Sequence, residues 1–340
     1  MGTFEGFLGV VLTTVLTAPS KKMTTCCADC GEAEGDVVNL KTCKSCMLVK
    51  YCNADCQRNH WPKHKKPCKQ RAAKLHDEAL FKDSPTKEDC PICFIPMPVN
   101  LLCCVSLPDA TISSVPINDF ANANERFENK DMQVYYSCCG KSICKGCVYS
   151  LRKSGNDDKC PFCNSDRGTK TEEEHVEELM KRVEAQDAAS ICMLAGYYFE
   201  GTRGFQQDYT KAMELYARAA DLGCSKGLSY LANIYYKGGN LKKAKFHYEA
   251  AAMAGDEVAR NNIASIEAQS GNMERAVKHW TIAASAGDFG AMNELIIEFK
   301  KGRVNRESMY STLAAYNISC AEMRSEARDA AIEATITETI

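Results

Sequence analysis

Residues 56–68 read CQRNHWPKHKKPC, two cysteines and two histidines within a stretch that is otherwise basic or polar. So few apolar residues cannot form a hydrophobic core. Cys52 lies four residues before Cys56, and His64 lies four before Cys68, so each pair shares one face of a helical turn. Thiolates and an imidazole are ligands that zinc prefers. The stretch therefore predicts a fold that is held together by metal.

The cysteines around this stretch are unevenly distributed. The chain contains 21 cysteines, and 18 of them lie between Cys26 and Cys163. Five pairs share the same two-residue gap: Cys27/Cys30, Cys43/Cys46, Cys90/Cys93, Cys144/Cys147 and Cys160/Cys163. This gap lets a tight turn aim two thiolates at one tetrahedral ion, whereas a disulfide framework has no reason to repeat it. The spacing predicts zinc and reduced thiols, and hence a cytoplasmic or nuclear protein.

Composition and charge restrict which classes of protein and partner are possible. A chain of 340 residues with 45% apolar and 25% charged residues is long enough for two or three folded domains. The net charge of −2 gives no reason to expect nucleic acid as a partner. The basic run KHKKPCKQR (63–71) is offset by acidic residues of the same region, which are Asp29, Glu32, Glu34, Asp36 and Asp55. We expect a solvated face there.

Residues 1–22 contain an apolar run from Phe7 to Leu16 that is interrupted by threonines. The run is too short and too broken to span a membrane, so we expect no membrane span. It could serve as the core of a leader peptide, although it lacks a basic start. Met23 begins a plausible polar N-terminus. Residues 1–22 are therefore either a removed leader or an overlong gene prediction, and both alternatives stay open.

Residues 23–68 resemble the MYND-type zinc finger. The resemblance rests on the ligand series, on the YC dipeptide at Tyr51, on the glycine after CADC and on the HW dipeptide at His60. It implies two interleaved zinc sites: Cys27, Cys30, Cys52 and Cys56 in one, and Cys43, Cys46, His64 and Cys68 in the other. His60 is four residues from both Cys56 and His64 and is an alternative ligand. Each ion would join distant segments and replace a core.

Residues 90–163 resemble a RING finger of the all-cysteine kind. The resemblance is carried by CPIC (90–93), CCGKSIC with the following cysteine (138–147), and CPFC (160–163). It implies two cross-braced zinc sites: Cys90, Cys93, Cys144 and Cys147 in one, and Cys138, Cys139, Cys160 and Cys163 in the other. A long polar insertion covers about residues 94–137. It contains Cys103 and Cys104, which could replace Cys138 and Cys139 as ligands.

The RING resemblance implies a ubiquitin ligase that recruits a ubiquitin-conjugating enzyme through Ile92 and Pro161. Such a ligase needs no catalytic residue, because it only orients its two partners. Four ligands on each ion also leave no open position for metal catalysis. Many active members have a basic residue after the last ligand, where this chain has Asn164. The alternative is a non-catalytic scaffold for protein–protein interaction.

The second half of the chain repeats with a period of 32 residues. Three segments align without gaps: KAMELYARAADLG (211–223), KAKFHYEAAAMAG (243–255) and RAVKHWTIAASAG (275–287). In the first, Ala212, Tyr216, Ala219, Ala220 and Gly223 illustrate the shared residues. Helix pairs repeated at this period form a solenoid. The segments resemble the SEL-like branch of the tetratricopeptide family, which implies that the solenoid binds proteins or peptides.

The sequence thus predicts a multidomain chain with two small zinc-stabilised α+β modules followed by an all-α helical-repeat solenoid, and with four zinc ions. The predicted parts are a leader (1–22), a MYND-type finger (23–68), a helical linker (69–89), a RING-type finger (90–163), a charged helical linker (164–187), SEL-like repeats (188–320) and a C-terminal polar helix or tail (321–340).

Overall fold

The computed structural model describes residues 26–34, 39–98 and 133–337. The leader expected at residues 1–22 and the alternative ligands Cys103 and Cys104 lie outside these ranges. The chain divides into two compact units, one ending at Lys82 and the other beginning at Asp83.

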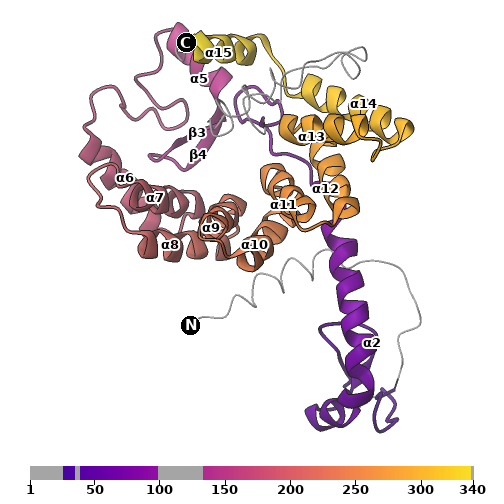
Figure 1. The fold of residues 1–340 in the computed structure, drawn as a ribbon. Coiled ribbons are helices and arrows are strands. Elements are labelled where there is room, and N and C mark those ends of the chain that lie inside the picture. Colours follow the sequence, from indigo (N-terminus) through magenta and orange to yellow (C-terminus); the bar gives the residue numbers. More distant parts are fainter. Residues whose placement is uncertain (1–25, 35–38, 99–132, 338–340) are drawn as a thin grey trace. The chain divides into compact units, whose positions relative to one another are not determined.

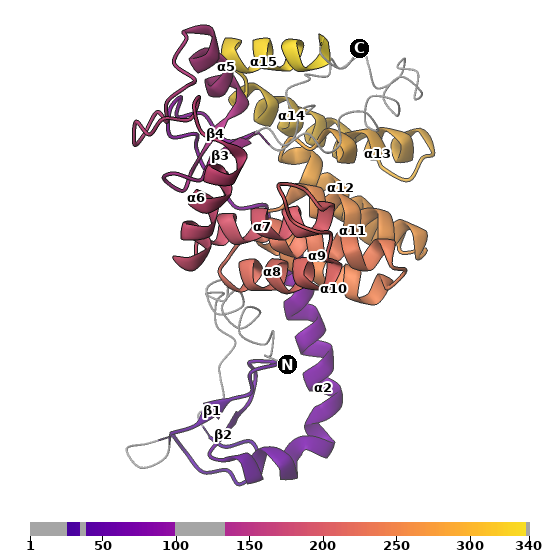
Figure 2. The same ribbon diagram turned by 90° about the vertical axis from the view of Figure 1, so that its left-hand side faces the viewer.

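The first unit is a two-stranded sheet beside one long helix. Strand β1 (Lys41–Thr42) pairs antiparallel with β2 (Lys50–Tyr51), and β2 contacts helix α2 (Ala54–Leu80) (Figure 2). The side chain of Asn53 begins the helix by accepting a hydrogen bond of 2.9 Å from the Cys56 N–H. The helix runs on without a break into the residues predicted as a linker. The interior consists largely of cysteines: Cys27, Leu40, Cys43, Cys46, Tyr51, Cys56 and Cys68.

The second unit begins with a cysteine-rich module. Strand β3 (Gln133–Tyr136) pairs antiparallel with β4 (Lys141–Cys144), and Val134 lies opposite Ile143. Helix α5 (Lys145–Lys153) follows directly, and the Cys144 thiol caps it by accepting from the Cys147 N–H. Residues 133–137 belong to the predicted insertion, whereas the structure pairs Gln133–Tyr136 as a strand. Four of the seven residues in the buried interior are cysteines; the seven are Cys90, Met97, Tyr136, Ile143, Cys144, Cys147 and Cys160.

From residue 172 to residue 322 the structure consists of helices and the short turns between them. The helices are α6 (Glu172–Glu184), α7 (Ala188–Glu200), α8 (Tyr209–Asp221), α9 (Ser225–Lys237), α10 (Leu241–Met253), α11 (Glu257–Gln269), α12 (Met273–Ser285), α13 (Phe289–Lys300) and α14 (Arg306–Glu322). They pack in pairs, α7 on α8, α9 on α10 and α11 on α12 (Figure 1). Most begin at an aspartate or asparagine whose side chain accepts from the backbone of the first turn.

The residues that define the predicted repeat occupy the helix contacts. Ala212, Tyr216, Ala219 and Ala220 are all buried, as are their equivalents in the next two repeats. Small side chains at these positions let paired helices approach closely. Gly223 follows the helix with a φ of +94°, which a residue with a Cβ rarely adopts. The prediction of a helical-repeat solenoid is confirmed.

The segment that follows Asp83 lies against the turns of the repeats. A Cβ placed on Gly255 would lie 2.7 Å from Cγ of Pro85, so glycine is required for this approach. The Lys87 ammonium donates to the carbonyl of Ala286 and, over 3.3 Å, to the Ser319 hydroxyl. These contacts fix the chain on the repeats immediately before it enters the cysteine-rich module.

The two ends of the repeat array both contact the cysteine-rich module. At one end the Tyr135 hydroxyl donates to Asp187 over 2.9 Å and lies 2.7 Å from the Ser190 hydroxyl. At the other end helix α15 (Glu326–Thr337) packs on α5, as Figures 1 and 2 show. The C-terminal residues, expected as a polar helix or tail, form a docked helix. None of the helices in the described ranges combines the length and apolar character that a bilayer crossing requires.

Candidate metal centres

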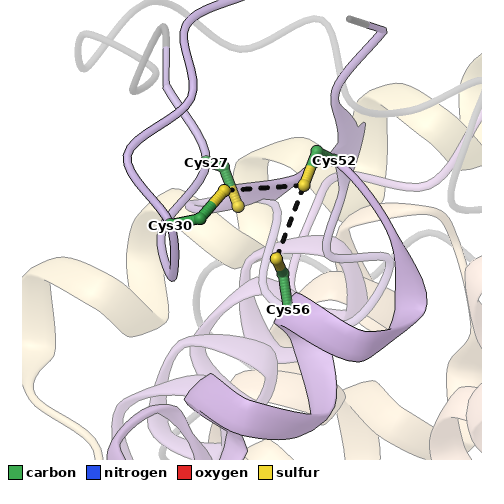
Figure 3. A group of neighbouring side chains, drawn as sticks. All are labelled: Cys27, Cys30, Cys52 and Cys56. Carbon is green, nitrogen blue, oxygen red and sulfur yellow. Dashed lines mark hydrogen bonds between the residues drawn. The ribbon is translucent and has the colours of Figure 1, made fainter.

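The structure brings the sixteen predicted metal ligands together in four groups. Within each group the ligand atoms all lie within 4.8 Å of one another. The groups are Cys27, Cys30, Cys52 and Cys56; Cys43, Cys46, His64 and Cys68; Cys90, Cys93, Cys144 and Cys147; and Cys138, Cys139, Cys160 and Cys163. This is the interleaved arrangement that the two resemblances imply. Figure 3 shows the first group, with its four sulfur atoms turned toward one another.

The distances within the groups fit one tetrahedral ion each. Four thiolates about 2.3 Å from a zinc ion lie about 3.8 Å from one another. In the first unit, which forms the first cysteine-rich module, Cys52 Sγ lies 3.6 Å from Cys30 Sγ, and Cys43 Sγ lies 3.8 Å from Cys68 Sγ. In the second, the corresponding sulfur distances are 3.7 Å for Cys90–Cys147, 3.9 Å for Cys93–Cys144 and 3.6 Å for Cys139–Cys160. The arrangement has the size of a zinc tetrahedron.

Four of the five closely spaced cysteine pairs form the same backbone turn. The residue after the second cysteine has a left-handed φ in each pair: +78° at Gly31, +56° at Met47, +54° at Phe94 and +58° at Asn164. Its N–H donates over 2.8–3.0 Å to the carbonyl of the first cysteine. The turn leaves both thiols on one side. The fifth pair, Cys144 and Cys147, is placed instead by the start of α5.

Burial, backbone N–H groups and neighbouring thiols shift the pKa values of the candidate ligands in opposite directions. Burial would raise the pKa of Cys27, but the backbone N–H groups around it lower that pKa to about 6. The same balance lowers the pKa of Cys90 to about 7. Neighbouring thiols act in the opposite direction: burial first, and then Cys43, raise the pKa of Cys68 to about 12. In the second group the pKa of Cys43 is lowered while that of Cys68 is raised, and a bound dication would favour the thiolate form of both.

His64, and not the alternative His60, lies in the second group. Its Nε2 lies 3.3 Å from Cys46 Sγ, and its side chain is buried. Burial, and then the charge of His60, lower the pKa of His64, which favours the neutral imidazole that binds metal. The His60 ring stacks on that of His64, and its Nδ1 lies 2.9 Å from the Tyr51 hydroxyl. His60 therefore supports the ligand from outside the group.

The two residues predicted to contact a ubiquitin-conjugating enzyme are on the surface of the second module. Ile92 is 36% exposed, and Pro161 is also exposed. Asn164, which stands where a basic residue was sought, occupies the left-handed position of its turn. Asparagine tolerates that backbone conformation better than most residues do. Asparagine therefore suits this turn, although Met47 and Phe94 occupy the same position in two other pairs.

Two arginines that were not among the predicted site residues reach this module from the helices on either side of the repeats, α6 and α15. The Arg182 guanidinium donates over 3.3 Å and 3.2 Å to the carbonyls of Ser137 and Cys138, beside the fourth group. The Arg328 guanidinium lies 3.5 Å from Cys93 Sγ in the third group. Both arginines stand in charged segments, where nothing in the sequence marks them as buried or bonded.

Family models match two regions of the chain. The model of the MYND finger matches residues 27–68, and the model of the Sel1 repeat matches residues 188–224, 225–256 and 267–288. The chain carries a MYND finger and Sel1 repeats. The first match begins and ends at candidate ligands, Cys27 and Cys68. The second covers the helix pairs from α7 to α10 and helix α12.

Proteins with similar sequences or structures match parts of the chain. The SET domain and MYND-type zinc finger protein 6 of Schizosaccharomyces pombe is 34% identical over 66 residues, which are 19% of this chain and 13% of that protein. This chain therefore spans a small part of that relative. A Sel1 repeat protein from Oxalobacter formigenes has 22% identity and a TM-score of 0.39, with 53% of this chain and 72% of that chain covered. A protective antigen of uropathogenic Escherichia coli with an SLR fold has 17% identity and a TM-score of 0.36, with 58% and 44% covered.

These findings give a general description of the molecule. A MYND finger is followed by Sel1 repeats, a combination suited to protein–protein interaction. The finger and the cysteine groups point to zinc binding.

Proposed function

We propose that this chain is a zinc-stabilised docking protein whose second cysteine-rich module recruits a ubiquitin-conjugating enzyme. The MYND finger and the Sel1 repeats would hold the proteins to be modified. The observation that carries the proposal is the interleaving of Cys90, Cys93, Cys144 and Cys147 with the fourth group, while Ile92 and Pro161 remain exposed. An exposed apolar residue and a proline beside two zinc sites suit a surface for that enzyme.

The proposal includes four zinc ions, one in each ligand group. Each ion is structural, because four protein ligands leave no position for water or substrate. Each also connects distant parts of the chain, as Cys90 and Cys93 are joined to Cys144 and Cys147. The cytoplasmic or nuclear location predicted from the sequence belongs to the same proposal, because thiols must remain reduced to bind zinc.

Transfer of ubiquitin would require no nucleophile from this chain. The enzyme that carries ubiquitin supplies the thioester, and the partner supplies the attacking amine. Holding both in one orientation removes the entropy cost of their encounter. The module and the docking regions would therefore accelerate the reaction by position alone.

A scaffold without ligase activity is the second candidate function. Asn164 favours it, since an amide cannot supply the charge that a basic residue would place between enzyme and ubiquitin. In this case the module from Cys90 to Cys163 would serve only to bind other proteins.

Self-ubiquitination with a panel of conjugating enzymes tests the proposal. Wild-type protein should acquire ubiquitin, and the Ile92→Ala variant should do so at least about tenfold more slowly, as loss of a central interface residue predicts. Leu48→Ala is the matched control, because Leu48 is 42% exposed on the other cysteine-rich module. Elemental analysis should find four zinc ions in each protein. No modification of zinc-loaded wild type by any enzyme of the panel would favour the scaffold.

A further inference from the structure

The C-terminal helix α15 inserts a fully buried arginine into the second cysteine-rich module. Arg328 has no exposed surface. Its Nη1 donates over 2.6 Å to the carbonyl of Pro96 and over 2.7 Å to that of Met323, and its Nη2 donates over 3.0 Å to the carbonyl of Ile95. The same Nη2 lies 3.5 Å from Cys93 Sγ. Two of the three carbonyls belong to the residues that directly follow the Cys90–Cys93 turn.

The surface of helix α5 is shaped to receive this arginine. A Cβ on Gly146 would lie 2.6 Å from Arg328 Cγ and 2.8 Å from the Arg328 backbone nitrogen. No side chain larger than that of glycine fits there without displacing α15. Gly146 stands between the candidate ligands Cys144 and Cys147, so the contact lies directly beside the third ligand group.

The charge of the ligand group explains why a buried guanidinium is stable there. Four thiolates around one Zn²⁺ carry a net charge of −2, and burying that charge is costly without compensation. The Arg328 guanidinium, 3.5 Å from Cys93 Sγ, is placed to balance that charge. A guanidinium that donates to a metal-bound thiolate also fixes the direction of that ligand.

We propose that Arg328 is a positioning residue for the zinc site of Cys90, Cys93, Cys144 and Cys147, and that it makes the docking of α15 and the binding of this zinc depend on each other. The inference rests on the zinc site proposed above. The arginine holds the residues after Cys93 in place and balances the charge of the site. The charged site in turn holds the arginine, so loss of the metal releases α15 from α5.

The test is the rate at which zinc leaves the full-length protein in excess chelator. Arg328→Met keeps the length of the side chain and removes its charge and donors. One of the four ions should leave about 10- to 100-fold faster than from wild type, the range for loss of a group that orients a metal ligand, while the other three leave at the wild-type rate. Arg324→Met is the matched control, because Arg324 pairs with Asp329 on a more exposed surface, and its release should equal wild type.

A second variant reaches the same contact without changing the arginine. Gly146→Ala should favour helix α5 by itself, yet its Cβ would push α15 away and speed release of the same single ion. Cadmium-113 spectra of cadmium-loaded protein identify the site, because one of the four resonances should shift in both variants. Arg328→Lys, which keeps the charge but only part of the hydrogen bonding, should give an intermediate rate.

The possible failures differ from one another. If wild type binds only the two ions of the MYND finger, the zinc site is refuted and the inference falls with it. If wild type binds four ions and Arg328→Met and Gly146→Ala release all of them at the wild-type rate, the inference alone is refuted. A uniform acceleration of all four ions, with a loss of helical circular dichroism, would likewise refute it as a general loss of stability.

Discussion

Asn164 has a left-handed backbone conformation at the position directly after the last candidate ligand. The turn after each closely spaced cysteine pair needs a left-handed residue, and Gly31, Met47, Phe94 and Asn164 occupy the four places. Three of them are not glycine, and each of these carries a steric cost of about 1–2 kcal/mol that the rest of the module must offset. Asparagine reduces this cost, and an arginine at the same place would increase it.

Replacing Asn164 by arginine should raise self-ubiquitination if the module acts as a ligase. A guanidinium can bond the conjugating enzyme and ubiquitin at once, so we expect the initial rate to increase about tenfold. The melting temperature should fall slightly, since arginine tolerates the left-handed φ less well. Asn164→Gly keeps the turn and adds no donor. Equal rates for the arginine and glycine variants would contradict the expectation.

Because His279 is buried, we expect the repeats to lose stability in mild acid. The side chain is buried in α12, and burial, followed by the charges of Arg260 and Arg275, lowers its pKa to about 3. The unfolded chain titrates near 6.5. Below pH 6.5 the unfolded state therefore binds a proton that the folded state does not. Stability falls by up to about 1.4 kcal/mol per pH unit as the pH drops from 6.5 toward 3.

The measurement compares the melting temperatures of wild type and His279→Gln from pH 7.5 to pH 5. The variant lacks this proton, so its melting temperature should improve relative to wild type as the pH falls. Loss of zinc at low pH affects both proteins and cancels in the comparison. Parallel curves over the whole range would show that His279 does not titrate in this way.

At the scale of elements, the helix pairs depend on small side chains at their contacts. Ala283 on α12 has no exposed surface and belongs to the core formed with α13 and α14. Leucine at this position should destabilise the repeats by about 1–3 kcal/mol, because it forces the helices apart. Urea unfolding followed by circular dichroism measures the loss. Lys278→Leu, on an exposed face of the same helix, should stay within about 0.5 kcal/mol of wild type.

The repeats could be predicted from the sequence because their residue types recur every 32 positions on helices of similar length. Strand β3 could not, since Gln133–Tyr136 is short, does not alternate polar and apolar residues, and follows a long polar stretch. The cysteine pairs could be predicted because their spacing is typical of metal ligands, and the two family resemblances implied how the pairs combine into groups. Arg182 and Arg328 could not, because a single arginine in a charged segment reads as a solvated residue.

For the molecule as a whole, removing zinc should unfold the cysteine-rich modules and spare the repeats. The interiors of the two modules are built largely of candidate ligands, whereas the core around Trp280 contains one cysteine among fifteen buried residues. Hydrogen exchange before and after chelation should show loss of protection in β3, β4 and α5, while α9, α11 and α12 keep theirs. Simultaneous loss in all of these elements would show that the repeats depend on metal.

The contacts of the module with both α7 and α15 also limit how the repeat array can change. In an open array each repeat contacts only its neighbours. Such an array can bend or stretch when it binds a partner, and the number of its repeats can change. Here the Asp187 end and the Arg328 end are fastened to one body, so the distance between them is set. Inserting one more unit would carry Arg328 away from Cys93. The contacts at both ends thus fix the number of repeats. A bound protein must fit the curvature that the repeat array has with both contacts formed.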